Sequence, residues 1–346
     1  MSTEQLLEKV LQYSPDTDKE VALELLISCN GDIDQVLQLI GVKQKSNKRQ
    51  MILGSPAINK HRNSPPLTTQ GGGLIHLFTP AQVEAAPTLC SLVPGPILDP
   101  STANSLLSEL LQDSTTWSNQ KFYLFDRMAS SPHSTASYTC NERVLANQDS
   151  TYQGRTVHAR PFTPAMHHAR KRVEEIVNEK YPGTAWYSDL IVANRYDGPS
   201  SGVGYHSDQL THIGPMPIIA GLSLGCSREF RLKSRAVKRS PTQFCIPLHH
   251  NSLIIMKPGC QEAWKHSIPT TRDGLSPHIL AGDTRISLTF RMYLESYSTP
   301  NLPRCDCGEP MLLRTLTKPP YRHIWQCAQA YSQNQSCGVT RDADNL

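Results

Sequence analysis

Residues 186–293 alternate between short apolar runs and turn residues. Six segments follow one another here: SDLIVANRY, IIAGLSLG, REFRLKSR, TQFCIPL, NSLIIMK and TRISLTFRMYL. Many short strands with turns between them, and no long helical pattern, are typical of an all-β sandwich or barrel. We therefore predict a mainly β core for this part of the chain.

The segment TRISLTFR has one polar face and one apolar face. Successive side chains of a strand point to opposite sides. The polar face carries Arg285, Ser287, Thr289 and Arg291, and the apolar face carries Ile286, Leu288 and Phe290. Arginine pairs with carboxylates in a bidentate way, so two arginines on the inner face of a barrel suit a dianionic ligand. Positions six apart on a strand are about 20 Å apart, so both side chains would have to converge on that ligand.

Two histidines and an aspartate form a candidate metal site. The stretch GVGYHSDQL places His206 and Asp208 two residues apart, so on an extended strand both side chains leave the same face. His266 follows sixty residues later in AWKHSIP. Two histidines and one carboxylate suit Fe(II) and leave coordination positions open for a co-substrate and O₂. A His-x-Asp triplet also occurs by chance, and the arginine-bearing strand is what strengthens this prediction.

A second candidate metal site lies near the C-terminus. Four cysteines, Cys305, Cys307, Cys327 and Cys337, occur within thirty-three residues. Four thiolates suit tetrahedral Zn²⁺, and so short a segment needs a metal for its folding energy. His323 is an alternative ligand. The remaining cysteines are scattered, which indicates reduced thiols in an intracellular protein rather than a disulfide framework.

The N-terminal region has a segregated charge pattern. Residues 1–42 hold eight acidic residues and two lysines, and their apolar spacing predicts three short helices between Glu4 and Ile40. Residues 43–62 hold six Lys/Arg and no acid, within a Pro- and Gly-containing linker that we place at 43–75. The linker suits nuclear targeting or a nucleic-acid contact, and a merely solvated linker is the alternative. No apolar run of eighteen residues predicts a membrane span, and no secretory signal is visible.

Taken together, these motifs resemble a known enzyme family. His206-x-Asp208, His266 and Arg285-x5-Arg291, preceded by Asn194-x-Tyr196, resemble the signature of the AlkB-type 2-oxoglutarate- and Fe(II)-dependent dioxygenases over residues 89–294. The resemblance implies a double-stranded β-helix (jelly roll) with flanking helices, placed here at residues 76–298. It implies that Fe(II) binds His206, Asp208 and His266, with O₂ as co-substrate. It also implies that 2-oxoglutarate binds Asn194, Tyr196, Arg285, Thr289 and Arg291.

The same resemblance suggests how a substrate is held. Enzymes that modify a base extrude it from the stack and hold it between aromatic side chains. Tyr138, Phe122 and Tyr123 are the candidates here, with a role in the core as the alternative. Arg228 and Arg231 belong to a basic strand and are candidate phosphate contacts, with a solvated hairpin as the alternative. Gln209 and Leu210 stand where DNA-repair members usually carry acidic residues, which leaves the substrate range open.

The terminal segments resemble two small modules. Residues 1–42 resemble CUE/UBA-like helical bundles, which implies ubiquitin as a partner, although Tyr13-Ser14-Pro15 replaces the usual Met-Phe-Pro. Residues 300–346 resemble a GRF-type zinc finger, which implies Zn(II) on the four cysteines. The resemblance also implies nucleic-acid contacts by Lys318, Arg322 and Trp325.

The predicted function is oxidative demethylation of N-alkylated bases, of the 1-methyladenine or 3-methylcytosine type, in single-stranded or damaged DNA. Such an enzyme would act in DNA repair in the nucleus, with the cytoplasm as a further location. An RNA demethylase of the same chemistry is one alternative. A non-catalytic adaptor that links ubiquitin to single-stranded nucleic acid is another, but an adaptor needs neither the three donors nor the two arginines.

Overall fold

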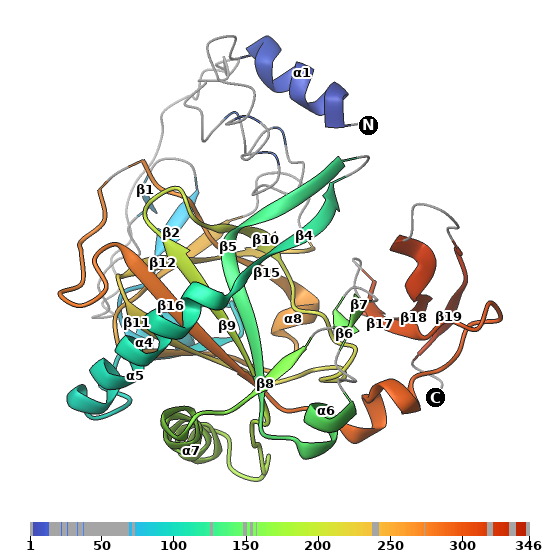
Figure 1. Cartoon of the computed structure of the whole chain (residues 1–346). Helices are drawn as coiled ribbons and strands as arrows, with labels where there is room; N and C mark the ends of the chain where they lie inside the picture. Colours follow the sequence, from blue (N-terminus) through green and yellow to red (C-terminus); the bar gives the residue numbers. More distant parts are fainter. Residues whose placement is uncertain are drawn as a thin grey trace, which may run out of the picture.

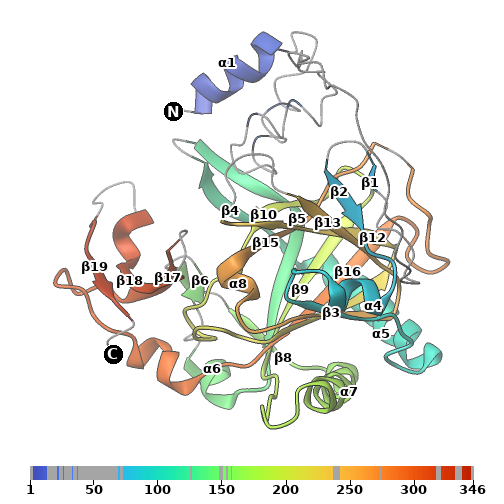
Figure 2. The ribbon, with the colours of Figure 1, turned by 180° about the vertical axis from the view of Figure 1, so that it is seen from behind.

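A computed structural model describes most of the chain (Figures 1 and 2). The described residues are 3–13, the single positions 22, 26, 33 and 37, and then 69–70, 73–124, 127–147, 151–152, 155–156, 158–236, 242–272, 274–316, 321–331 and 337–343. Within these residues the protein is mainly β, with two large sheets, flanking helices and a small C-terminal sheet.

The first large sheet has six strands. Their order is β1 (Thr69–Gln70), β2 (Leu74–His76), β13 (Gln243–Leu248), β12 (Arg228–Ser234), β15 (Trp264–Ile268) and β10 (Val203–His206). Neighbours are antiparallel except for β2 and β13, which run parallel. The pairing of β10 with β15 sets His206 opposite His266.

The second large sheet has eight strands. Seven follow the order β3 (Cys90–Val93), β14 (Ser252–Met256), β11 (Ile219–Gly225), β16 (Thr284–Arg291), β9 (Leu190–Asp197), β5 (Arg127–Thr139) and β4 (Ser118–Leu124), and β8 (Ala159–Pro161) pairs with β5. All six predicted alternating segments are therefore strands of one of the two sheets.

The chain passes back and forth between the sheets. Of the eight consecutive strands from β9 to β16, the eight-stranded sheet takes β9, β11, β14 and β16, and the six-stranded sheet takes β10, β12, β13 and β15. The resulting orders, β9-β16-β11-β14 and β10-β15-β12-β13, are those of a double-stranded β-helix. One apolar core lies between the sheets and includes Ile219, Ile254, Met256, Phe230, Leu232, Phe244 and Ile246. The predicted jelly-roll fold is confirmed.

Helices α5 (Pro100–Asp113) and α7 (Pro164–Lys180) cover the outer face of the eight-stranded sheet (Figure 1). Each begins with a proline after a side-chain cap, from Asp99 for α5 and Thr163 for α7. Their apolar faces share one core cluster with the back of β16: Leu106, Leu107, Leu110, Met166, Val173, Ile286, Leu288 and Phe290. The predicted apolar back of the strand is confirmed.

Shorter elements complete the described chain. The helices are α1 (Thr3–Tyr13), α4 (Pro80–Ala85), α6 (Glu142–Asn147) and α8 (Cys260–Ala263), and the 3-10 helices are η1 (Ser114–Thr116), η2 (Glu295–Tyr297), η3 (Thr299–Asn301) and η4 (Ala328–Tyr331). A two-stranded sheet joins β6 (Thr151–Tyr152) to β7 (Arg155–Thr156). In the N-terminal region α1 and four single helical positions are described; the rest of the predicted bundle and residues 43–68 of the linker lie outside the described residues.

The C-terminal sheet packs against the jelly roll through a shared core. Its strands are β17 (Met311–Thr315), β18 (His323–Cys327) and β19 (Thr340–Asp342), all antiparallel, and they lie to one side of the two large sheets in Figure 1. Met311, Leu313 and Trp325 belong to the same apolar cluster as the interior of the sandwich. We call residues 304–343 the C-terminal module.

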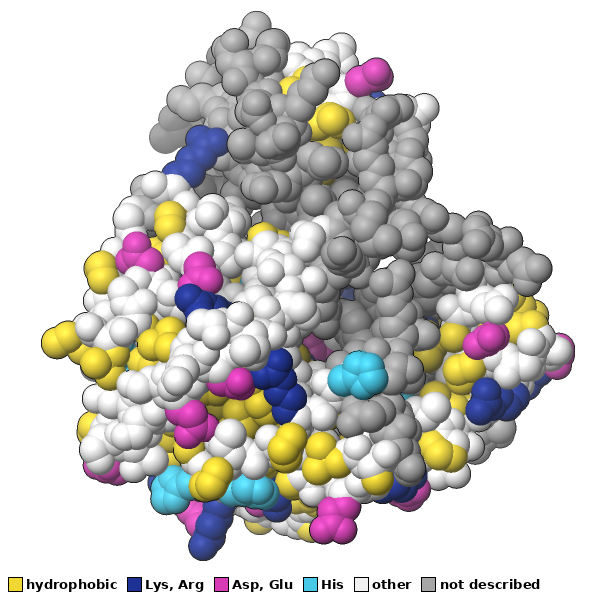
Figure 3. Space-filling model, viewed as in Figure 1, with side chains coloured by type: hydrophobic (Ala, Val, Ile, Leu, Met, Phe, Trp, Pro, Cys, Tyr) yellow, Lys and Arg dark blue, Asp and Glu magenta, His cyan; other side chains and the backbone are white. Residues whose placement is uncertain are grey.

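Charges are mixed over the surface. On the face in Figure 3, the described Lys and Arg side chains are interspersed with Asp and Glu rather than gathered in one patch. None of the helices that the structure describes combines the length and the apolar character needed to cross a bilayer.

Candidate active site

The side chains of His206, Asp208 and His266 meet at one point between the two large sheets. One donor atom of each lies within 4.8 Å of the other two. Asp208 Oδ1 is 3.4 Å from His266 Nε2 and 3.9 Å from His206 Nε2. Two imidazoles and a carboxylate grouped in this way can bind one face of a metal ion and leave its other positions open.

The strand that carries His206 is shorter than the sequence suggested. We expected His206 and Asp208 to share one strand, but β10 ends at His206 and Asp208 lies in the loop that follows. Two hydrogen bonds hold this loop: Ser207 Oγ donates to the Trp264 carbonyl at 2.9 Å, and the Asp208 amide donates to Gln261 Oε1 at 2.7 Å. The loop brings Asp208 to the two histidines although the strand does not.

Glycine at position 202 permits the close approach of β10 to β15. A Cβ added there would lie 2.7 Å from the Ile268 carbonyl oxygen. That distance is shorter than a carbon–oxygen contact allows, so a larger residue would push the two strands apart. Because His206 and His266 sit on these two strands, the separation of the imidazoles depends on this approach.

His206 is set up as a neutral donor. His206 Nδ1 lies 2.9 Å from the Gly204 carbonyl and donates to it, so Nε2 presents its lone pair to the site. Desolvation in the site, followed by the proximity of His266, lowers the pKa of His206 to about 4. A neutral imidazole at physiological pH is the form that binds a metal.

Asp208 stays ionised because of its neighbours. Burial alone would raise the pKa of this carboxyl, but Arg291 and the two histidines hold the pKa well below its usual range. Arg291 donates to Asp208 Oδ2 from Nε at 3.0 Å and from an Nη at 2.5 Å. Oδ1, which faces the histidines, is the oxygen left to bind a cation.

Arg285 occupies a different place from Arg291. Its side chain is 2% exposed, it donates to Ser223 Oγ at 2.8 Å, and its guanidinium lies 5.4 Å from the centre of the Tyr196 ring. Its Nε and one Nη are buried without a hydrogen-bond partner among the described residues. Burial lowers the pKa of Arg285 to about 10, so it remains charged at neutral pH. A buried cation with two unsatisfied donors is a site for an anion.

The strand register explains why the two arginines do not converge on one point. Arg285 pairs with Tyr196 at one end of β9, and Arg291 pairs with Leu190 at the other. Asn194 lies between them, opposite Ser287, and Thr289 lies next to Gly221 of β11. The predicted 2-oxoglutarate residues therefore line one stretch of β9 and β16, with Arg291 directed at Asp208 and Arg285 directed at Ser223.

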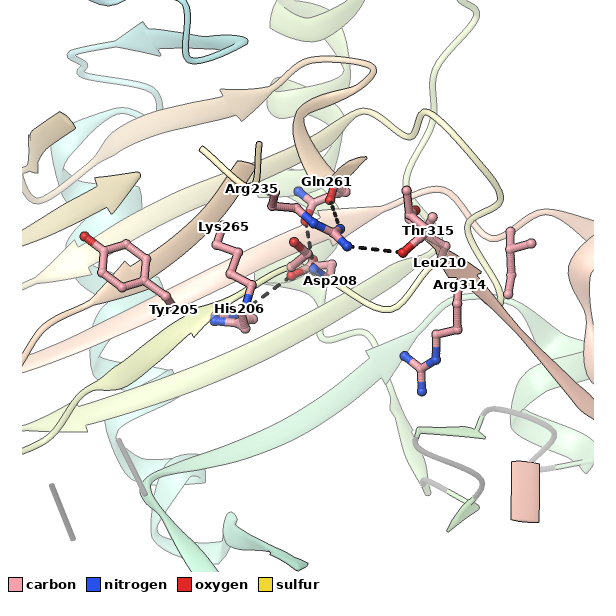
Figure 4. Close-up of a pocket in the computed structure, with 11 residues that line it drawn as sticks. Tyr205, His206, Asp208, Leu210, Arg235, Gln261, Lys265, Arg314 and Thr315 are labelled. Carbon is pink, nitrogen blue, oxygen red and sulfur yellow. Dashed lines mark hydrogen bonds and ion pairs between the residues drawn. The ribbon is translucent and has the colours of Figure 1, made fainter. Parts of the chain in front are cut away.

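A pocket of about 260 Å³ opens beside the metal donors (Figure 4). His206, Asp208, Leu210, Gln261 and Lys265 line it on the jelly-roll side. Residues Leu313, Arg314 and Thr315 of β17 line it on the side of the C-terminal module. Gln209 donates from Nε2 to Thr211 Oγ1, whereas Leu210 is buried in the core shared with the module.

The structure corrects one predicted base contact. Tyr138 is 1% exposed in the core under α5, where Trp117 Nε1 donates to its hydroxyl and that hydroxyl donates to Asp113. A ring so enclosed cannot stack on a base, and the prediction for Tyr138 was wrong. Phe122 and Tyr123 lie on β4, but their side chains are outside the described residues.

The two predicted phosphate contacts differ from each other. Arg228 is 4% exposed and its guanidinium donates to the backbone carbonyls of Gly198, Ser201 and Pro269. This side chain joins the β9–β10 loop to the segment after β15, so its prediction as a phosphate contact was wrong. Arg231 is partly exposed on the outer face of the six-stranded sheet and pairs with Glu229 at 2.6 Å.

The four C-terminal cysteines also meet at one point. Their sulfur atoms all lie within 4.8 Å of one another, with Cys305 and Cys337 3.6 Å apart and Cys307 and Cys327 3.5 Å apart. A disulfide has sulfur atoms about 2.05 Å apart, so neither pair is bonded. His323 instead points at Glu262, 3.3 Å away. Trp325 is 6% exposed and stacks on Tyr297, which makes it a core residue rather than a nucleic-acid contact.

Sequence patterns did not identify three residues that support the site. Gln261 holds the Asp208 loop, Ser223 holds Arg285, and His133 stacks on Tyr196 with ring centres 5.1 Å apart. Gln261 lies in the same PGCQEAWKHSIP stretch as His266, which was a usable signal. Ser223 and His133 come from other strands, and only the sheet pairing brings them to the site.

Comparison with known proteins gives the family. A sequence model described as the 2OG-Fe(II) oxygenase superfamily matches residues 90–291, more than half of the chain. DNA oxidative demethylase ALKBH2 of Arabidopsis thaliana is 30% identical over 51% of this chain and 58% of its own length. ALKBH2 of Mus musculus is 27% identical over 56% of this chain and 75% of its own.

A third relative is the human alpha-ketoglutarate-dependent dioxygenase alkB homolog 3. It is 27% identical over 61% of this chain and 69% of its own length. The chain thus spans a little over half of the Arabidopsis relative and about two thirds or more of the other two. On the match to residues 90–291, the chain belongs to the 2OG-Fe(II) oxygenase superfamily, whose members depend on Fe(II) and 2-oxoglutarate.

Proposed function

We propose that this protein oxidatively demethylates N-alkylated bases, of the 1-methyladenine or 3-methylcytosine type, in single-stranded nucleic acid. The observation that carries the proposal is the convergence of His206, Asp208 and His266 beside a buried arginine with unsatisfied donors. Relatives whose names describe DNA oxidative demethylases support this choice of substrate within the family.

The donor set fits Fe(II). His206 Nε2, His266 Nε2 and Asp208 Oδ1 are the atoms that would hold it, and the Arg291 ion pair keeps the carboxylate ionised and oriented. When bound there, Fe(II) supplies the open positions at which 2-oxoglutarate and O₂ react. The chain's own contribution is to keep the His206 imidazole neutral, to fix Asp208 through Gln261 and Arg291, and to leave one side of the site open to the pocket.

Arg285 is suited to the distal carboxylate of 2-oxoglutarate. Its two unsatisfied donors match a carboxylate. Thr289 lies on the same strand, β16, and Tyr196 lies on the neighbouring strand, β9. The metal-side carboxylate would lie toward Asn194 and Arg291. The attraction between the dianion and the two arginines offsets the desolvation cost of burying the charges of both partners.

Replacing Arg285 with glutamine is expected to raise the KM for 2-oxoglutarate roughly 10- to 100-fold, because a hydrogen bond to a charged group contributes about 1.5–3 kcal/mol. Initial rates measured over a range of 2-oxoglutarate concentrations test this. Arg172→Gln, on the exposed side of α7, is the charge-matched control. An unchanged KM in Arg285→Gln would place the co-substrate elsewhere.

The substrate class is tested by formaldehyde release. Oligonucleotides with one 1-methyladenine or 3-methylcytosine, as DNA and as RNA, are supplied with Fe(II), 2-oxoglutarate and ascorbate. Release from either strand type supports base demethylation; faster release from DNA favours DNA repair, whereas faster release from RNA favours an RNA demethylase. If iron-loaded protein releases no formaldehyde from either, base demethylation is contradicted.

We also propose that Zn(II) binds Cys305, Cys307, Cys327 and Cys337. Sulfur atoms around a tetrahedral zinc, with bonds of about 2.3 Å, lie about 3.8 Å apart, close to the two separations observed. Ubiquitin binding by residues 1–42 and a nuclear location stay predictions, because most of the residues on which they depend lie outside the described chain.

A further inference from the structure

We propose that His133 is a positioning residue for 2-oxoglutarate. Its imidazole stacks on the Tyr196 ring and thereby fixes where the tyrosine hydroxyl meets the co-substrate beside Arg285. The inference rests on the proposed function, because it takes Tyr196 and Arg285 as part of the 2-oxoglutarate site. It adds a residue of β5, a strand that carries none of the co-substrate residues named above.

Three adjacent strands bring His133, Tyr196 and Arg285 into one row. Tyr196 of β9 pairs with Arg285 of β16. Ser134 of β5 pairs with Arg195 of β9, so the same register, continued by one residue, sets His133 opposite Tyr196. The two rings stack with their centres 5.1 Å apart and their planes at 25°. Because directly opposite residues of neighbouring strands share a face, and Tyr196 belongs to the core between the sheets, the row lies on the inner face.

The Tyr196 ring depends on packing for its orientation. Its side chain is 3% exposed, yet its hydroxyl makes no hydrogen bond with any residue that the structure describes. Burial raises the pKa of this hydroxyl, so it stays protonated and can donate to a carboxylate. The ring is flanked by the Arg285 guanidinium, 5.4 Å from its centre, and by the His133 ring. Since Arg285 is proposed to bind the distal carboxylate, the stack with His133 is the contact that holds the ring.

His133 is itself held by the β9–β10 loop. Its Nδ1 donates to the Gly202 carbonyl at 3.2 Å, and Ser131 Oγ lies 2.6 Å from the same nitrogen. Ser201 Oγ donates to the Pro132 carbonyl at 2.8 Å. Desolvation lowers the pKa of His133 to about 4, so the imidazole is neutral at physiological pH and adds no charge to the co-substrate site. The loop therefore fixes the imidazole on the side away from Tyr196.

This loop is a firm anchor. The buried Arg228 side chain joins it to the segment after β15 by donating to three backbone carbonyls, those of Gly198, Ser201 and Pro269. A hydrogen bond from a charged donor contributes more than a neutral one, so the loop resists displacement. A change of the His133 side chain should therefore be felt at Tyr196 rather than be absorbed by movement of the loop.

The test measures binding of 2-oxoglutarate to anaerobic, Fe(II)-loaded protein by calorimetry. His133→Ala is expected to raise the Kd about 3- to 10-fold, the range for loss of one aromatic pair. His133→Phe keeps a ring on Tyr196 and should stay within about twofold of the wild-type Kd. His133→Asn keeps a donor for Gly202 but no ring, and should behave like His133→Ala. The control His278→Ala removes a ring that stacks on His250 and should leave the Kd unchanged.

A double-mutant cycle decides whether His133 acts through Tyr196. If it does, adding His133→Ala to Tyr196→Ala should change the Kd by less than about twofold. In steady-state assays His133→Ala should raise the KM for 2-oxoglutarate and leave the iron content and the KM for the methylated oligonucleotide near wild type. A merely structural role would change all three together.

Three results would overturn the inference: a wild-type Kd in His133→Ala, equal Kd values in His133→Phe and His133→Asn, or single-variant effects that multiply in the double variant. If His133→Ala fails to fold, as judged by thermal melting, the comparison of His133→Phe with His133→Asn decides, because both variants keep a side chain that fills part of the space.

Failure of the proposed function would look different. A wild-type Kd in Arg285→Gln would place the co-substrate elsewhere and overturn the inference with it. A raised Kd in Arg285→Gln beside a wild-type Kd in His133→Ala would contradict the inference alone. A protein that binds 2-oxoglutarate but demethylates no base would contradict the proposed substrate, and the Kd values would still decide the role of His133.

Discussion

Replacing His206 with alanine is expected to reduce formaldehyde release more than about 100-fold and to lower the iron content of the purified protein. Loss of residues that only support a metal ligand already costs about 10- to 100-fold, and His206 is proposed as a ligand itself. The fold should survive, because the His206 side chain is partly exposed. The measurements are metal analysis and single-turnover assays under saturating 2-oxoglutarate.

His278→Ala is the matched control. His278 is partly exposed, stacks on His250 and lies outside the cluster of donors. It should keep wild-type iron content and rate. If His206→Ala keeps both as well, the metal is held by other residues, and the three-donor site proposed here is wrong.

Replacing Cys327 with serine is expected to release zinc and to decrease kcat/KM for a methylated oligonucleotide by more than about tenfold. Zinc in small cysteine modules contributes about 10–16 kcal/mol to folding, so its loss should unfold the module. Cys327 lies on β18 opposite Met311 of β17, and β17 lines the pocket. Unfolding there removes a pocket wall as well as the zinc site.

The measurements are zinc content, hydrogen exchange of β17 and steady-state kinetics. Cys140→Ser is the control, since Cys140 contacts Arg170 away from both candidate metal sites. Iron content should stay near wild type in Cys327→Ser, because the three iron donors belong to the jelly roll. Full activity after complete zinc loss would show that β17 does not depend on the metal or does not shape the pocket.

Much of the fold could be predicted because it depends on local patterns. The alternation of Arg285 to Arg291 predicted a strand with an apolar back, and the structure packs Ile286, Leu288 and Phe290 under α5 and α7. Helices α5 and α7 begin where a proline follows a capping residue, which is likewise a local feature of the sequence. Apolar residues that recur every two residues in a strand, or every 3.6 residues in a helix, can be recognised within a short window of the sequence.

The same reasoning failed where a side chain's surroundings come from distant strands. Tyr138 and Arg228 have the right chemistry for nucleic-acid contacts, yet Tyr138 is enclosed beneath α5 and Arg228 holds two loops together. Aromatic and basic residues serve in cores and in binding sites alike. Burial decides between the two roles, and burial is a property of the packed chain.

The sequence by itself determined the donor types, the strand alternation and the four clustered cysteines, because these are properties of residue identity and short spacing. Only the tertiary structure decided that Arg291 holds Asp208, that Arg285 lies apart with unsatisfied donors, and that β17 reaches the pocket. Those contacts join residues up to about a hundred positions apart. Sheet pairing and core packing set them, and both follow from burying apolar surface across the whole chain rather than from any local pattern.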